Sequence, residues 1–203
     1  MRQDKEGTWI LSFLELKICM QMLGCNNWNY FPVLEEQSSL QERIVRSFLE
    51  LEEMGFVEQD DDMFVRTNQL YSYFQKVVDA DWIVQVLGKK RVPALYAVKG
   101  ECITSIEQIS VQNQRARVYE TNINTFFSDV FEVENPDEDI IYDFLDLDLR
   151  EKIEKAIYII RFSHDDRDWK SFVWRAREGL MMNVQDGTVR FFREREVRRL
   201  LEV

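Results

Sequence analysis

The sequence predicts an α+β fold in which antiparallel sheets are flanked by helices and the N-terminal segment is winged-helix-like. Three observations support this prediction. Of the 203 residues 45% are apolar and only 7 are glycine and 3 proline, which is typical of a folded domain with few linkers. Apolar residues recur with helical spacing over the first 80 residues. From residue 82 the spacing changes to alternation, with short turns that imply antiparallel pairing.

The N-terminal elements begin with two helices. Residues 8–24 carry a wide apolar face and end at Gly24, a favourable C-terminal cap, so they predict a well-buried helix. Ser39 and Glu42 have the spacing of a capping box and open a second helix that runs to about Met54. Gly55 ends this helix.

A hairpin and a third helix follow. Two short apolar runs, 56–58 and 63–66, flank three consecutive aspartates at 60–62 and predict a strand pair with an acidic turn. Asn68 is placed to cap a helix that runs to about Val78. The order helix, helix, hairpin is that of a winged-helix module, so we assign residues 1–80 to one winged-helix-like segment.

Residues 81–203 form an α+β region with antiparallel strands, and we expect it to make one compact unit with the first segment. Strands, a helix, further helices, more strands and a terminal helix are predicted in that order. The first four strands are expected at 82–87, 93–98, 102–111 and 115–120, and the helices that follow at 122–132 and 135–155. Four more strands are expected at 157–162, 169–175, 180–185 and 189–192, and the last helix at 194–201.

The charge and the rare residues exclude several classes of protein. A net charge of −11 and an acidic hairpin turn would repel phosphate, so we expect no nucleic-acid partner. The three cysteines, Cys19, Cys25 and Cys102, show no metal-binding or disulfide spacing and fit a reducing compartment; we expect Cys19 and Cys102 to be buried. The single histidine, His164, lies in an acidic run that we interpret as a turn between strands. We therefore predict no enzyme, no metal and no cofactor.

The N-terminus is polar and no apolar stretch reaches membrane-spanning length. We therefore expect a cytoplasmic protein that does not insert into a membrane.

Four short phrases over about residues 8–134 resemble EspG-type proteins, the cytosolic chaperones of type VII (ESX) secretion. Each phrase marks a helix end or a turn in that family's order of elements. They are Met22-Leu23-Gly24, Gly55-Phe56-Val57, Asp81-Trp82-Ile83-Val84 and Lys99-Gly100-Glu101. The resemblance implies an α+β fold and a non-enzymatic adaptor that holds a helical secretion substrate before export.

A protein-binding adaptor needs an exposed patch with large anchoring side chains. The candidate residues are two aromatic groups and part of a C-terminal arginine cluster, namely Trp28, Tyr30, Phe31, Trp169, Phe172, Trp174, Arg193 and Arg195. The same aromatic residues could instead belong to the core, and the arginines could pair with the protein's own acidic residues.

Two other functions remain open. The helix and hairpin order would also suit a winged-helix transcriptional regulator with a C-terminal sensing domain, and the acidic run around His164 could support carboxylate chemistry. We favour the adaptor, with a helical protein as partner. Exposed strand edges would also permit a homodimer.

Overall fold

The computed structural model describes residues 7–26, 28–31, 33, 40–59, 63–65, 68–88, 92–110, 112–131, 151, 156, 158–164, 167–176, 179–184, 189–191 and 194–201. The chain divides into two compact units. Unit 1 comprises 1–80 and 104–120, and unit 2 comprises 81–103 and 121–203. The expected division after residue 80 coincides with one boundary, but 104–120 belong to unit 1 rather than to the C-terminal region.

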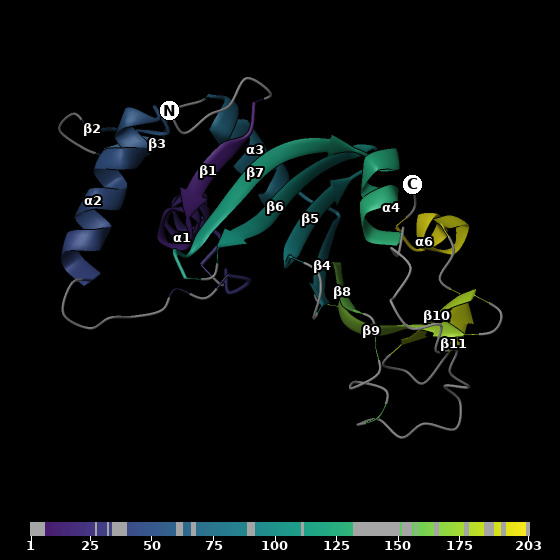
Figure 1. Ribbon diagram of the computed structural model, residues 1–203. Helices are drawn as coiled ribbons and strands as arrows, with labels where there is room; N and C mark the ends of the chain where they lie inside the picture. Colours follow the sequence, from purple (N-terminus) through teal and green to yellow (C-terminus); the bar gives the residue numbers. More distant parts are fainter. Residues whose placement is uncertain are drawn as a thin grey trace. The chain divides into compact units, whose positions relative to one another are not determined.

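Unit 1 contains helices α1 (Phe13–Met22), α2 (Leu40–Glu53) and α3 (Gln69–Val78), labelled in Figure 1. The second and third helices agree with the sequence prediction. Gly55 follows α2 with a φ of 71° and Gly24 follows α1 with a φ of 85°. Glycine adopts this left-handed backbone without a Cβ penalty, so both residues end their helices where the sequence predicted.

The first predicted helix is shorter than expected. Residues Trp9–Ser12 form strand β1, and α1 begins only at Phe13. The Ser12 hydroxyl accepts from the Glu15 N–H at 3.2 Å while the Glu15 carboxylate accepts from the Ser12 N–H at 2.6 Å. This reciprocal capping box fixes the start of α1, and the four residues before it pair with a distant strand.

Unit 1 contains two antiparallel strand pairs, β1–β7 and the hairpin β2–β3. β1 pairs with β7 (Arg115–Asn122), and the neighbour of β7 is β6 (Cys102–Ser110). A separate hairpin, β2 (Val57–Gln59) with β3 (Met63–Val65), forms where it was predicted. The aspartates of its turn lie outside the described residues. The order α1, α2, hairpin, α3 is therefore present.

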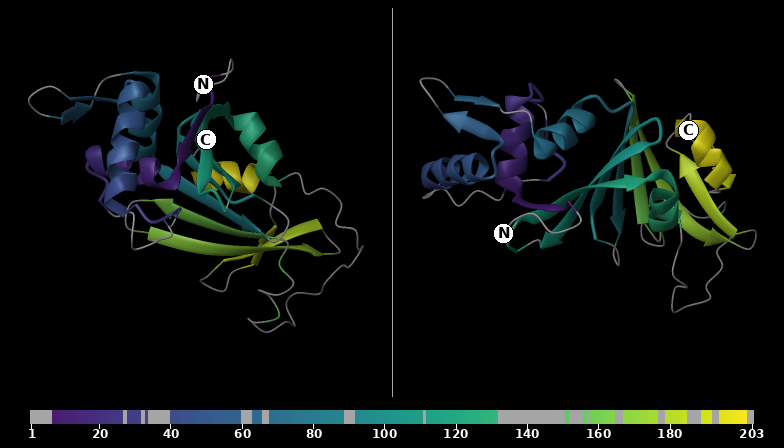
Figure 2. Two further views of the ribbon diagram at one scale, coloured as in Figure 1. Left: turned by 60° about the vertical axis from the view of Figure 1, so that its left-hand side comes forward. Right: turned by 90° about the horizontal axis from the view of Figure 1, so that it is seen from above.

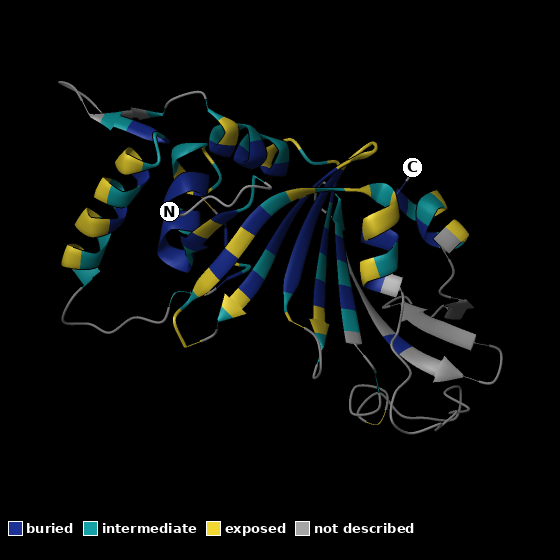
Figure 3. Cartoon of the chain, turned by 45° about the horizontal axis from the view of Figure 1, so that its top comes forward, coloured by how far each residue is buried: buried dark blue, intermediate teal, exposed yellow. Residues whose placement is uncertain are grey.

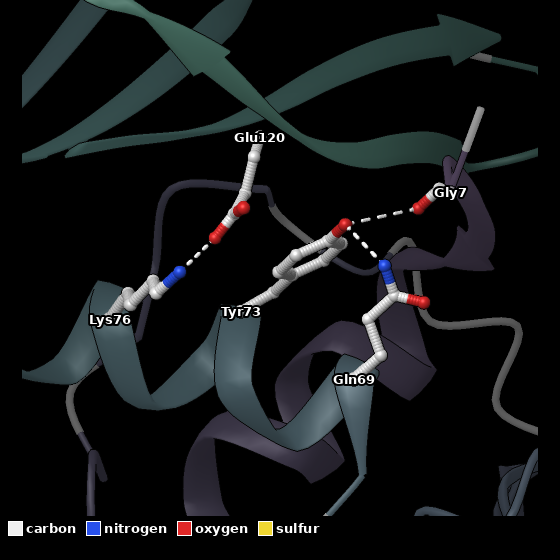
Figure 4. Close-up of polar contacts among 5 residues, drawn as sticks. All are labelled: Gly7, Gln69, Tyr73, Lys76 and Glu120. Atoms are coloured by element: carbon white, nitrogen blue, oxygen red, sulfur yellow. Dashed lines mark hydrogen bonds and ion pairs between the residues drawn. The ribbon is translucent and has the colours of Figure 1, made fainter.

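Polar contacts hold α3 in unit 1 (Figure 4). The Tyr73 hydroxyl donates to the Gly7 carbonyl at 3.3 Å and accepts from Gln69 Nε2 at 2.9 Å. Lys76, one turn further along α3, forms an ion pair with Glu120 of β7. Side chains of α3 thereby link this helix to the backbone at Gly7 and to a side chain of β7.

Unit 2 is built on a six-stranded antiparallel sheet in the order β5-β4-β8-β9-β10-β11. The strands are β4 (Trp82–Gly88), β5 (Ala94–Lys99), β8 (Tyr158–His164), β9 (Arg167–Ala176), β10 (Gly179–Val184) and β11 (Val189–Phe191). All of these strands were predicted. The pairing of β4 with β8, for instance Val84 opposite Phe162, joins residues far apart in the sequence and was not predicted.

Two helices cover one face of this sheet, α4 (Ile123–Phe131) and α6 (Glu194–Leu201) (Figures 1 and 2). Alternate residues of the strands, among them Val84, Tyr96 and Phe162, form one buried cluster with Phe126 of α4 and Val197 of α6. The Tyr96 and Phe126 rings meet edge to face with centroids 5.0 Å apart. The predicted α+β class, antiparallel sheet flanked by helices, is confirmed.

Within the described ranges, no helix has both the length and the hydropathy needed to cross a bilayer. The predicted helical region at 135–155 lies almost entirely outside those ranges.

Candidate functional site

The first aromatic group proposed for partner binding lies in the segment after α1. Trp28 and Phe31 are buried in unit 1, with 4% and 5% of their surface exposed, whereas Tyr30 is half-buried. Phe31 packs against Phe13 of α1 with ring centroids 5.3 Å apart, and Trp28 packs against Tyr30 at 4.9 Å. This burial agrees with the alternative that these rings belong to the core.

The second aromatic group lies along one strand. Trp169, Phe172 and Trp174 are residues of β9, where their backbones pair with Phe162, Ile159 and Met181 respectively. Their side chains are outside the described part of the chain, so their role as partner anchors stays a prediction.

Arg195 and its neighbours on α6 make contacts within unit 2. The exposed Arg195 has its Nε 2.7 Å from Glu196 Oε1. Arg198 donates to Asn124 Oδ1 at 3.3 Å, and its guanidinium lies 4.5 Å from the centre of the Phe127 ring. At least part of the cluster therefore serves the fold of unit 2. Arg193 lies outside the described residues.

A different surface presents apolar side chains to solvent. On α2, Val45 and Leu49 are 60% and 54% exposed and lie four residues apart, about one helical turn. Figure 3 shows exposed bands along this helix. Glu52, Glu53 and other exposed charged residues continue the same solvent-facing side of the helix. Two large apolar residues at this spacing form a small patch with a charged rim, which we call the α2 patch.

The sequence contained a signal for this patch. In the sequence, Ile44, Phe48, Leu51 and Met54 form one apolar stripe along the second helix, and the structure places them at buried or half-buried positions. Val45 and Leu49 are four residues apart and fall outside that stripe. Apolar residues outside the buried stripe of an amphipathic helix are the pattern that would have identified the patch.

Unit 1 also contains a hollow of about 460 Å³ beside α2. Its walls come from the end of β1 and the start of α1, from α2, and from the β6–β7 turn region. The lining residues are Ile10, Leu11, Ser12, Leu14, Arg43, Arg46, Ser47, Glu50, Asn113 and Arg115. We call this the arginine hollow, because three arginines outnumber its single carboxylate.

Sequence reasoning missed the arginine hollow because its residues come from three separate segments. In the sequence, Arg43 and Arg46 are the two basic residues of a mainly acidic helix, and Arg115 begins a predicted strand. Their convergence depends on the pairing of β1 with β7, which places Ser12 opposite Arg115. Because the sequence predicted a single helix over residues 8–24, it indicated no strand at 9–12 and therefore no pairing with β7.

The remaining chemically active side chains are dispersed. His164 ends β8, where its ring stacks on Trp82 at 4.6 Å and its Nδ1 lies 2.6 Å from the Asp81 carbonyl oxygen. Asp165 and Asp166 lie outside the described residues. Among the residues that the structure describes, no group of three or more histidine, cysteine or carboxylate side chains could hold a metal ion.

The cysteines differ in environment. Cys19 is buried as expected, and burial together with the nearby Glu15 raises the pKa of its thiol. The expectation that Cys102 is buried was wrong: it is exposed, because it is the first residue of β6 and directly follows the turn at Gly100.

Neither a scan against protein-family models nor a search of curated proteins finds a match to this chain.

Proposed function

We propose that this protein is a non-enzymatic adaptor that binds another protein, and that it acts as a cytosolic chaperone of the type VII secretion kind. The observation that carries the adaptor proposal is the α2 patch. Val45 and Leu49 each expose more than half of their surface on one side of a helix. Apolar surface rimmed by charge is typical of protein interaction sites.

The geometry of the patch favours a helical partner. Residues four apart on a helix form a ridge that fits the groove between side chains of another helix. The acidic residues around the patch would select a partner with basic residues at the contact's edge. The type VII assignment rests on the sequence resemblance alone and names the kind of helical protein that we expect.

The test is an affinity pull-down from the native cytosol with wild-type protein and two double variants. We expect a small helical protein in near-stoichiometric amount with the wild type, and its loss with Val45→Gln/Leu49→Gln. A matched control, Val92→Gln/Ile109→Gln, removes two other exposed apolar side chains, which are 58% and 51% exposed. The control should retain the partner.

Loss of the partner in both double variants would place the contact elsewhere, and no stoichiometric protein with the wild type would contradict the adaptor proposal. Circular dichroism of each variant checks that the helices are intact.

The order of the first helices and the hairpin supports a second candidate, a transcriptional regulator of the winged-helix type. Helices α1 and α2 followed by the hairpin β2–β3 have the helix, helix, hairpin order of such a module. Exposed Glu42, Glu52 and Glu53 on α2 oppose this candidate, because they would face phosphate groups with like charge. Salt-sensitive binding to duplex DNA in a gel-shift assay would support the regulator, and no shift at low salt would eliminate it.

A further inference from the structure

The arginine hollow has the charge of an anion-binding site. It gathers Arg43, Arg46 and Arg115 around one depression in a chain whose net charge is −11. Glu50 partly compensates them: its carboxylate lies 3.6 Å from Arg46 Nε, in a pair whose arginine side chain is 81% exposed. Guanidinium groups bind carboxylates through two parallel hydrogen bonds, so a group of three favours a ligand with several carboxylates.

The hollow also borders a strand edge. The Phe13 N–H donates to the Gln114 carbonyl at 2.8 Å, which continues the register of β1 with β7. In an antiparallel pair the N–H and C=O groups of successive residues point alternately toward and away from the partner strand. Trp9 and Leu11 therefore direct their N–H and C=O toward β7, whereas Ile10 and Ser12 direct theirs away from it. The Ser12 N–H is used by Glu15. Ile10, which lines the hollow, therefore directs an N–H and a C=O away from β7.

These two features together define the ligand. We propose that the arginine hollow binds a short acidic peptide segment, whose carboxylates pair with the three arginines and whose backbone pairs with Ile10. β1 lies at the end of its strand order, where an added strand can join. A volume of about 460 Å³ accommodates a few side chains of such a segment.

The strand edge is what favours a peptide over a free anion. A small anion uses the guanidinium groups alone, whereas a peptide also supplies the amide N–H and C=O that match those of Ile10. The proposal rests on the proposed function, because the acidic segment belongs to a protein partner. The hollow and the α2 patch share helix α2, so one partner can contact both.

The experiment measures fluorescence anisotropy with purified full-length protein and a labelled, acetylated peptide of about nine residues in which glutamate and valine alternate. The comparison peptides carry glutamine at every glutamate position or an N-methyl group on the central residues. We expect the glutamate peptide to bind at least about tenfold more tightly than the glutamine peptide, and to weaken as salt is added. N-methylation should weaken binding several-fold because it removes backbone hydrogen bonds.

Three variants assign the binding to the hollow. Arg43→Gln/Arg46→Gln should weaken the glutamate peptide at least about tenfold. The matched control Lys99→Gln/Arg199→Gln removes two exposed positive charges outside the hollow and away from β1, and it should bind like the wild type. Glu50→Gln removes the competing carboxylate and should bind several-fold more tightly, an increase that misfolding cannot produce.

The proposal is overturned if the glutamate and glutamine peptides bind equally, or if Arg43→Gln/Arg46→Gln binds like the wild type. It is also overturned if free glutarate displaces the peptide at a glutarate concentration equal to the peptide's dissociation constant, because a free anion would then bind as tightly as the peptide. Equal binding of the N-methylated peptide would overturn the role of Ile10. This assay contains no cellular partner, so its failure is distinct from failure of the pull-down, which depends on the α2 patch.

Discussion

At the residue scale, Tyr73 shows how one buried polar group joins separate segments. Its ring is buried. Its hydroxyl donates a hydrogen bond to the Gly7 carbonyl and accepts one from Gln69 Nε2 (Figure 4). Gly7 has a φ of 82°, and a Cβ there would lie 3.1 Å from Gln69 Nε2. Glycine therefore satisfies both the backbone conformation and the close approach of this contact.

Ionisation of the Tyr73 hydroxyl makes the free energy of unfolding depend on pH in the alkaline range. Burial raises the pKa of Tyr73 above its ordinary value of 10.0. In the unfolded chain the phenol loses its proton above about pH 10, while the folded protein retains it. The contribution of Tyr73 to the free energy of unfolding is therefore constant below pH 10 and declines as pH rises toward the folded pKa.

We predict that Tyr73→Phe lowers the free energy of unfolding by about 1 kcal/mol at pH 7, since it removes two hydrogen bonds but keeps the ring. The difference from wild type should narrow above pH 10, because the variant lacks this titrating group. Urea unfolding between pH 7 and 11 measures both effects. Tyr71→Phe, on the same helix, controls for loss of a phenol. A difference that stays constant over this pH range would contradict the prediction.

At the scale of elements, Asn68 connects the start of α3 to the residues that follow α2. Its Oδ1 caps α3 by accepting from the Tyr71 N–H at 2.8 Å. Its Nδ2 donates to the carbonyls of Gly55 at 2.8 Å and Met54 at 3.2 Å, just after α2. One amide thus satisfies an N–H at the start of one helix and two carbonyls after the end of another.

We predict that Asn68→Ala lowers the free energy of unfolding by about 2–3 kcal/mol, the sum of a lost cap and two lost hydrogen bonds. Asn68→Asp retains the capping oxygen but places a charge against two carbonyl oxygens, so it should be at least as destabilising at pH 7. The repulsion raises the pKa of the introduced carboxyl, so part of this loss should be recovered as pH falls and the carboxyl is protonated.

Thermal unfolding of both variants at pH 7 and pH 4 tests this prediction. Ser12→Ala serves as the matched control, because Ser12 caps α1 through Glu15 with no such link to another helix. It should cost only about 1 kcal/mol. If Asn68→Asp were as stable as wild type, the contacts to Met54 and Gly55 would contribute nothing.

The elements that the sequence predicted well are those with local signals. Asn68, Gly24 and Gly55 lie at helix ends because their side chain or backbone conformation determines the end directly. Strand β1 was missed because its four residues are apolar enough to continue the helical pattern of α1. The sequence did contain a signal for the start of α1, because Ser12 and Glu15 have the spacing of a capping box and make its two hydrogen bonds in the structure.

At the scale of the molecule, the pairings between strands that are far apart along the chain could not be predicted from the sequence. Strand β8 pairs with β4, and β1 pairs with β7, across about 75 and 100 intervening residues. Hydrophobic alternation shows that a strand exists but does not name its neighbour. The arginine hollow depends on such a pairing, so the candidate site was predictable only where its residues are neighbours on one helix.

The division into units has a consequence for fragments of the chain. The unit boundaries at 103–104 and 120–121 fall inside strands β6 and β7 rather than in linkers. A fragment of residues 1–80 therefore lacks part of unit 1, including the residues of β7 that pair with β1. Without β7, Leu11 loses its strand partner and Lys76 loses its ion-pair partner, Glu120.

We predict that a fragment of residues 1–80 does not fold into its native structure. Leu11 is fully buried in the complete chain, and uncovering such a side chain costs about 1.5–3 kcal/mol. That loss is large beside the marginal stability of a small domain. The amide NMR spectrum of the fragment should show narrow dispersion, whereas the full chain should show the wide dispersion of a packed sheet. A well-dispersed fragment spectrum would mean that α1, α2, α3 and the hairpin fold without β7, as an independent winged-helix module would.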